Sequence, residues 1–170
     1  MLGDLLIVPL AAWLIVSAVA CFGVYIVQRG RPAVSVGVVD PTLLIIPVRS
    51  VPPYLPELWR GICAQTHQPT RVIFAVESVA DPVYERLRKL SGGPPVEVVV
   101  AGEAHRRGQK IHNLLAALAH LEASDAIVIF ADADIAPAAD WLARLLRDLD
   151  RRDIGMTSGY RWLMPTDERW

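Results

Sequence analysis

The sequence has only two cysteines, no excess of charge of either sign and no tract of low complexity. Two cysteines in 170 residues exclude a small fold stapled by disulfides. The 17 basic and 18 acidic residues leave no basic excess to neutralise a run of phosphates, so nucleic acid is not expected as a partner. With 53% apolar and 21% charged residues, the chain is also too hydrophobic to be disordered. Its length suits a single globular domain.

The apolar residues are concentrated near the N-terminus, where Leu5–Val27 carries no charge. A helix of this length reaches about 35 Å, which is enough to cross a hydrocarbon core of about 30 Å. A cleaved signal peptide fits less well, because no Lys or Arg precedes the run and no A-x-A-like site ends it. A buried core helix fits less well, because so long a run lacks a polar face. The sequence therefore predicts a transmembrane helix over residues 5–27.

The charges that flank this segment predict its orientation. Asp4 precedes it, whereas Arg29 and Arg31 follow it, so the positive-inside rule places the rest of the chain in the cytoplasm. Cys21 lies within the predicted span and Cys63 in a predicted helix, so they are not expected to form a disulfide, in keeping with a reducing compartment. We expect a single-pass protein of the cell (inner) membrane.

After a linker at residues 28–42, short apolar runs alternate with segments of helical spacing. Asp81 and Pro82 are expected to open one helix, as N-cap and first helical residue. The alternation predicts an α/β fold, a parallel sheet with helices on both faces. The expected strands are residues 43–48, 71–76, 96–100, 126–130 and 154–158, and the expected helices are about 53–67, 81–90, 109–121 and 139–149.

Polar and charged residues stand where the predicted strands end, and the carboxyl edge of a parallel sheet is where ligands bind. Paired carboxylates in Asp132-Ala133-Asp134 suit a hard divalent cation that also bridges to substrate phosphates. Lys110 adds a cation at a helix start, which favours an anion. Taken singly, an isolated D-x-D is usually a solvated turn, Glu77 an exposed strand end and Lys110 a surface charge. Their convergence at one edge favours a functional site.

The order of these motifs resembles that of family 2 glycosyltransferases, most closely the membrane-bound ceramide glucosyltransferase-like branch. Four stretches carry the resemblance, which covers about residues 43–162: LLIIPVRSVPPYLPELWRGICAQTHQPTRVIFAVES, GQKIHNLLAAL, IVIFADADIAP and TSGYRW. The resemblance implies a GT-A fold, which is a Rossmann-like and mostly parallel sheet. It also implies transfer of a hexose from a nucleotide-sugar, a uridine diphosphate-hexose, to a lipid acceptor at the membrane.

The resemblance also assigns residues to the donor. Pro47 and the residues after it, including Arg49, would line the nucleotide pocket, and Glu77 would contact the nucleoside. Gln109 and Lys110 match the family's helix start near the nucleotide.

Further along the chain, the resemblance assigns a metal motif and an acceptor side. Asp132 and Asp134 match the D-x-D motif that holds the metal and diphosphate, with Asp134 as the direct ligand of Mg²⁺ or Mn²⁺ and Asp132 closer to the ribose. Tyr160, Arg161 and Trp162 would approach the acceptor.

One departure from the family pattern concerns catalysis. Family members continue with an acidic catalytic base and a Q-x-x-R-W motif, whereas Arg169-Trp170 here follows Thr166 in place of the Gln. We therefore expect residues 43–170 to be a nucleotide-sugar-binding domain that is incomplete at its C-terminus, and the catalytic residue is unknown. A non-catalytic, membrane-anchored nucleotide-binding module that needs a partner chain is the alternative. A dinucleotide-dependent oxidoreductase is disfavoured, because no G-x-G-x-x-G follows the first strand.

Overall fold

The structure is a computed structural model that describes residues 13, 15–19, 22, 41–147, 149 and 154–159. The chain divides into two units, Met1–Ser35 and Val36–Trp170. In the first unit the described residues are helical, and the side chains of Trp13, Ile15, Val16, Val19 and Phe22 are 64–66% exposed. Among the described residues, no helix has both the length and the apolar character needed to cross a membrane. Most of the transmembrane helix predicted at Leu5–Val27 lies outside them.

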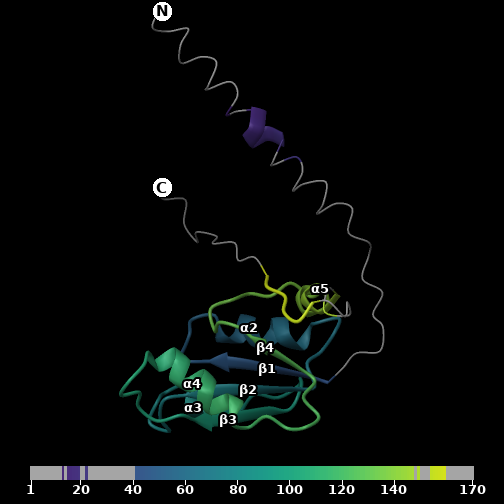
Figure 1. Ribbon diagram of the computed structural model, residues 1–170. Helices are drawn as coiled ribbons and strands as arrows, with labels where there is room; N and C mark the ends of the chain where they lie inside the picture. The colour runs from purple at the N-terminus through teal and green to yellow at the C-terminus, as the bar shows by residue number, and fades with distance from the viewer. Residues whose placement is uncertain are drawn as a thin grey trace, which may run out of the picture. The chain divides into compact units, whose positions relative to one another are not determined.

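The second unit contains a four-stranded parallel sheet with the order β3-β2-β1-β4 (Figure 1). In chain order the elements are β1 Thr42–Pro47, α2 Leu55–Cys63, β2 Arg71–Val76, α3 Tyr84–Arg88, β3 Val96–Val100, α4 Gln109–Leu118, β4 Ile127–Phe130 and α5 Trp141–Arg147. Each strand is a short apolar run without Gly, which suits a strand covered on both faces. The predicted α/β fold is thus confirmed for this unit.

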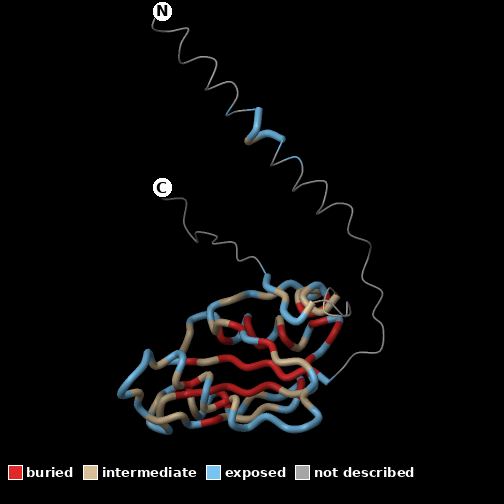
Figure 2. Tube along the Cα trace, in the orientation of Figure 1, coloured by how far each residue is buried: buried red, intermediate tan, exposed pale blue. Residues whose placement is uncertain are grey.

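Helices cover both faces of the sheet. On one face, side chains of α2, α3 and α5 pack on Leu44, Ile46 and Val48 from β1 and its end, and on Phe74 from β2. On the other face, α4 packs through Ala117 on a smaller cluster from β1, β2 and β3. The central strands β1 and β2 are the most deeply buried part of the domain (Figure 2).

Two expectations differ from the structure. Residues 154–158 do not form a strand; Thr157 Oγ1 instead donates a hydrogen bond to the carbonyl of Leu145 at 2.7 Å, which attaches the segment to α5. Asp81 does not cap a helix that begins at Pro82, because α3 starts at Tyr84 and Val83 is its N-cap residue. The Asp81 carboxylate instead stabilises the turn before α3, where it accepts a hydrogen bond from the backbone N–H of Val83 at 2.9 Å.

Helix α4 is oriented differently from what its apolar residues suggest. Asn113 and Ala117 are its buried residues, whereas Ile111 is 51% and Leu115 45% exposed. Leu114 and Leu118 still pack against the sheet, and Asn113 Nδ2 adds a hydrogen bond of 3.1 Å to the carbonyl of Ala75 in β2.

Candidate functional site

The strand order places a site between β1 and β4. The chain proceeds from β1 to β2 and β3 on one side of β1 and then returns to β4 on the other side, so β1 and β4 form the point at which strand order reverses. In open α/β sheets, ligands bind at the carboxyl ends of strands at this point. A pocket of about 280 Å³ lies there, lined by Pro47, Arg49, Pro52, Lys110, Asp132, Ala133 and Asp134. Five of the residues singled out in the sequence therefore line one pocket.

Lys110 and Asp132 form an ion pair at this pocket. Helix α4 starts at Gln109, so Lys110 lies in its first turn, and Asp132 follows β4. The ammonium Nζ lies 2.5 Å from Asp132 Oδ1, with the two side chains 58% and 37% exposed. A pair as exposed as this adds at most about 1 kcal/mol to stability. The main effect of the pair is therefore to hold the ammonium of Lys110 beside the carboxylates, where a ligand can reach it.

A strained turn fixes the backbone directly after Arg49. Ser50 has a φ of 55°, in the left-handed region that residues other than Gly seldom adopt. Its backbone N–H donates to Asp81 Oδ2 at 2.9 Å, and Asp81 belongs to the loop between β2 and α3. Asp81 thus ties the loop after β1 to the loop after β2. Strain of this kind is common at ligand sites, where the surrounding structure holds it.

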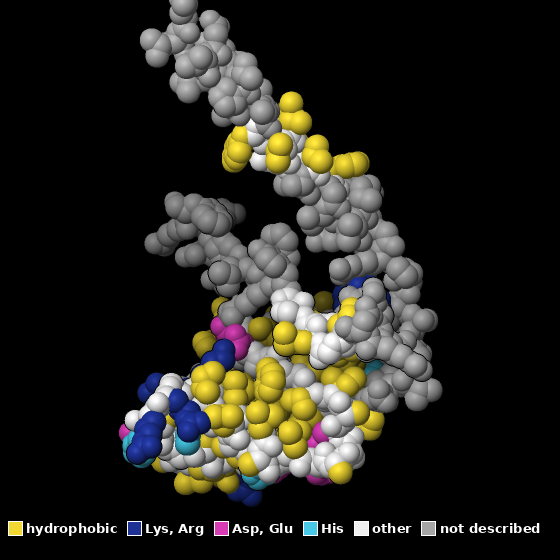
Figure 3. All heavy atoms as spheres, viewed as in Figure 1, with side chains coloured by type: hydrophobic (Ala, Val, Ile, Leu, Met, Phe, Trp, Pro, Cys, Tyr) yellow, Lys and Arg dark blue, Asp and Glu magenta, His cyan; other side chains and the backbone are white. Residues whose placement is uncertain are grey.

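The side chain of Gln109 binds the loop between β3 and α4 through hydrogen bonds. Its amide Nε2 donates to the carbonyl of Gly102 at 2.8 Å and to Asn113 Oδ1 at 2.7 Å, and its Oε1 accepts the N–H of Ala104 at 2.9 Å. These bonds hold the loop between β3 and α4 against the start of α4. His105, Arg106 and Arg107, at the tip of this loop, are exposed. Lys and Arg side chains gather beside α4 in Figure 3.

Glu77 lies at the end of the neighbouring strand. It follows β2, and its carbonyl accepts the N–H of Gly102 at 3.0 Å, but it does not line the pocket between β1 and β4. Since Pro47 pairs with Ala75 in the sheet, Glu77 stands level with Arg49 on the adjacent strand. The carboxylate therefore belongs to the same sheet edge and extends the polar surface beyond the pocket.

A buried glutamine positions the segment after Asp134, a role that the sequence did not suggest. Gln65, which is 4% exposed, donates to the carbonyls of Gly61 and Ala138 at 2.8 and 2.7 Å and accepts the N–H of Leu142 at 2.9 Å. At Gly61, an added Cβ would lie 2.9 Å from the Pro137 ring. This close approach brings the segment from Asp134 to α5 against α2. No local sequence pattern reveals a partner 73 residues away.

The carboxylates of Asp132 and Asp134 are the groups here that suit a divalent ion. Hard cations of this kind take carboxylate oxygens, keep several waters and often share a substrate phosphate. Among the residues described, no three His, Cys, Asp or Glu side chains come together as a metal-binding group. Two carboxylates leave coordination positions that phosphate oxygens and water could fill.

The groups with shifted pKa values lie away from this pocket. The Arg71 guanidinium hydrogen-bonds Asp125 and lowers the pKa of that carboxyl, while the pKa of Arg71 is raised in return. Burial lowers the pKa of His67 and raises that of the Cys63 thiol. None of these groups lines the pocket between β1 and β4. Tyr160, Arg161 and Trp162 lie outside the described residues.

A parallel sheet that gathers a lysine, an arginine and two aspartates at its strand-order reversal defines an α/β domain that binds a ligand at its sheet edge. The family model of Glycosyl transferase family 2 matches residues 43–169. The chain belongs to this family. No curated protein matches its sequence. Family membership indicates glycosyl transfer from a nucleotide-sugar donor to an acceptor.

Proposed function

We propose that this chain is the donor-binding part of a membrane-anchored hexosyltransferase that transfers a hexose from a uridine diphosphate-sugar to a lipid. The observation that carries the proposal is the pocket between β1 and β4. There, two strand ends and one helix start bring Arg49 and Lys110 together with Asp132 and Asp134. A diphosphate needs cations, and a metal-bound diphosphate needs carboxylates as well, so this combination suits a nucleotide diphosphate.

The roles of the side chains follow from their charge and place. Lys110, at the start of α4, and Arg49, at the end of β1, supply positive charge to the diphosphate. Glu77, on the adjacent strand end, accepts hydrogen bonds from the nucleoside. Pro47 lines the pocket, and Gln109 acts indirectly by holding the loop that ends at Gly108.

Asp134 and Asp132 would hold Mg²⁺ or Mn²⁺. Such an ion, when bound, stabilises the negative charge that develops on the leaving diphosphate. The ammonium of Lys110, 2.5 Å from Asp132 Oδ1, would add to that stabilisation and would also fix the orientation of this carboxylate.

Membrane anchoring and the lipid acceptor belong to the same proposal. The uncharged run Leu5–Val27 supports the anchor, and Arg29 and Arg31 support a cytoplasmic domain. Tyr160, Arg161 and Trp162 would face the acceptor. A reporter enzyme fused after Trp170 should be active only in the cytoplasm, and periplasmic activity would contradict this orientation.

The donor is tested by equilibrium binding of the full chain in lipid nanodiscs to a panel of nucleotide-sugars. Uridine diphosphate-glucose and -galactose, guanosine diphosphate-mannose and free uridine diphosphate would be compared in the presence of Mn²⁺. We expect the uridine compounds to bind at least tenfold more tightly than the guanosine compound. Equal and weak binding of the whole panel would reject the donor site.

A further inference from the structure

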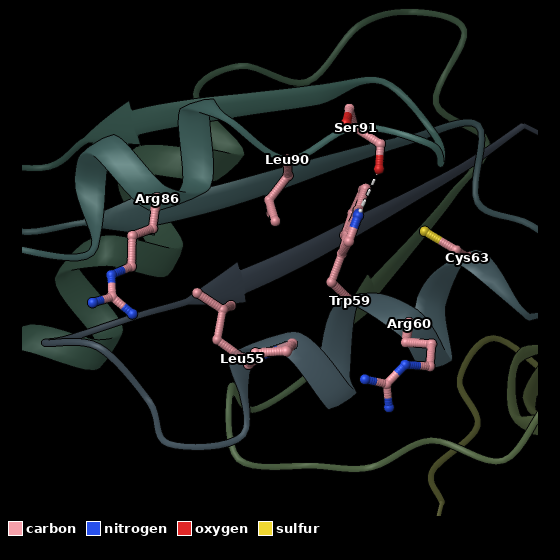
Figure 4. A pocket seen from close by; sticks show the side chains of 8 residues that line it. Leu55, Trp59, Arg60, Cys63, Arg86, Leu90 and Ser91 are labelled. Atoms are coloured by element: carbon pink, nitrogen blue, oxygen red, sulfur yellow. Dashed lines mark hydrogen bonds between the residues drawn. The ribbon is translucent and has the colours of Figure 1, made fainter.

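A second and larger pocket, of about 530 Å³, lies between α2 and α3 and contains none of the residues of the proposed donor site. It is lined by Leu55, Pro56, Trp59, Arg60, Cys63, Arg86, Leu90 and Ser91 (Figure 4). Its volume is in the range of about 300–1,000 Å³ that is typical of small-molecule sites.

The inner wall of the pocket is apolar. Leu55 is 4% and Trp59 9% exposed, and Leu90 is partly buried. The one polar atom of the Trp59 ring is already satisfied, because Nε1 donates to the carbonyl of Ser91 at 2.9 Å (Figure 4). A sugar or a nucleobase packed against this inner wall would lose hydrogen bonds to water that Leu55, Trp59 and Leu90 do not replace. An alkyl chain has no such cost.

Two arginines add positive charge to this apolar wall. Arg60 comes from α2 and Arg86 from α3, and Figure 4 shows the apolar side chains of Leu55, Trp59 and Leu90 between them. Among the residues described, no acidic side chain lines the pocket. Within the described part of the chain, neither guanidinium has an ion-pair partner, whereas Arg88, also on α3, pairs with Glu85 and stacks on Tyr84. Two unpaired guanidinium groups at an apolar pocket are complementary to an anion with an apolar tail.

We propose that the pocket between α2 and α3 binds an alkyl carboxylate, with its chain against Leu55, Trp59 and Leu90 and its carboxylate at one of the two arginines that flank them, Arg60 or Arg86. The carboxylate suits guanidinium groups, which bind it through paired N–H donors. The proposal does not depend on the donor site, because the two pockets share no residue.

Cys63 provides a reporter of occupancy, because its thiol is part of the pocket lining. The full chain carrying Cys21→Ser, in nanodiscs of zwitterionic lipid, would be treated with N-ethylmaleimide at about pH 9, since burial raises the pKa of the Cys63 thiol. The rate of Cys63 alkylation would be followed by mass spectrometry with hexanoate, octanoate or decanoate present. We expect saturating decanoate to slow alkylation about tenfold. The concentration for half-protection should fall by up to about fourfold for each added methylene that is buried.

Two comparisons test whether the charges of the ligand and of the two arginines contribute to binding. Decanol, which has the same chain length without the charge, should protect at least tenfold more weakly than decanoate. The double variant Arg60→Gln/Arg86→Gln should lose the preference for decanoate, and Arg60→Lys/Arg86→Lys should regain part of it. Arg88→Gln is the matched control on α3 and should behave as the parent protein.

Equal protection by decanol and decanoate would overturn the proposal, as would full protection by decanoate in the double glutamine variant. Absence of protection by decanoate in the parent would overturn it too. The comparison of the two ligands needs only the parent protein, so it decides the question even if a variant fails to fold.

Discussion

The ammonium of Lys110, in the first turn of α4, lies 2.5 Å from Oδ1 of Asp132, the residue that begins the D-x-D sequence after β4. The pair joins a helix that follows β3 to the end of the strand on the far side of β1. It therefore depends on the crossover of the chain, and both partners are exposed enough to meet a ligand. This pair connects the fold to the proposed donor chemistry.

Replacing Lys110 should separate binding from stability. Lys110→Met removes a pair that contributes at most about 1 kcal/mol to stability, so the urea midpoint should barely change. It also removes a positive charge from the proposed diphosphate site, so binding of a uridine diphosphate-sugar should weaken about tenfold or more. Calorimetry and urea unfolding measure the two effects. The chain's other lysine, Lys89, is exposed at the end of α3, and Lys89→Met should change neither quantity.

Gln109 is predicted to act through the loop between β3 and α4. Gln109→Ala removes its hydrogen bonds to Gly102, Ala104 and Asn113, so the amides of residues 102–108 should exchange with deuterium faster. Binding of the donor should weaken as well, because the loosened loop lies next to Lys110. The exposed Gln68, which bonds only the carbonyl of Cys63 among the residues described, is the matched control. Unchanged exchange in Gln109→Ala would show that the loop does not depend on this side chain.

Gln65 is predicted to support both stability and the site. Gln65→Ala removes the hydrogen bonds to the N–H of Leu142 and to the carbonyl of Ala138. The buried N–H of Leu142 loses its partner, whereas the carbonyl of Ala138 keeps the N–H of Trp141, so the change should cost about 1–3 kcal/mol. Because these groups belong to the segment after Asp134, metal-assisted donor binding should weaken as well. Urea unfolding gives the first effect, and calorimetry at a temperature where the variant is folded gives the second. A loss of stability with donor binding unchanged would limit Gln65 to a structural role.

Asp125 and Arg71 should make stability depend on pH. The side chains of Asp125 and Arg71 are 2% and 15% exposed, and their pairing lowers the pKa of Asp125. The folded state therefore binds a proton less readily than the unfolded state. The resulting stabilisation is present above the ordinary aspartate pKa of about 3.9 and is lost as the pH falls through the lower folded value.

Accordingly, Asp125→Asn should cost about 3 kcal/mol near neutral pH, and the difference from the parent protein should shrink below about pH 4. Urea unfolding at several pH values measures this. Asp140→Asn, which breaks the exposed pair with Arg144, should cost less than about 1 kcal/mol. Equal costs for the two variants would contradict the burial argument.

Features set by local sequence could be predicted, and those set by distant partners could not. The strands at 71–76 and 96–100 match β2 and β3 because continuous apolar runs mark strands that are covered on both faces. Residues 154–158, with a Gly, a Thr and a Ser among them, are a weaker run, and they do not form a strand; Thr157 bonds to α5 instead. Asn113 is buried on α4 and bonds the carbonyl of Ala75, a contact that apolar periodicity does not include.

The same distinction applies to the site. Arg49, Lys110 and the D-x-D carboxylates were predicted to meet because strand ends converge in any parallel sheet, and they line one pocket. The contacts of Asp81 with Ser50 and of Gln65 with Leu142 were not predicted, since each joins a side chain to a backbone group remote in sequence.

The most direct test of the central proposal is calorimetry of a uridine diphosphate-sugar with the full chain, in Mn²⁺ and in chelator, for the parent, Asp134→Ala and Asp132→Ala. If Asp134 is the direct ligand of a metal-bound diphosphate, the parent should bind more tightly with Mn²⁺. Asp134→Ala should lose most of that gain, and Asp132→Ala should lose less of it. Binding that is independent of the metal and unchanged in both variants would contradict the assignment of the D-x-D carboxylates.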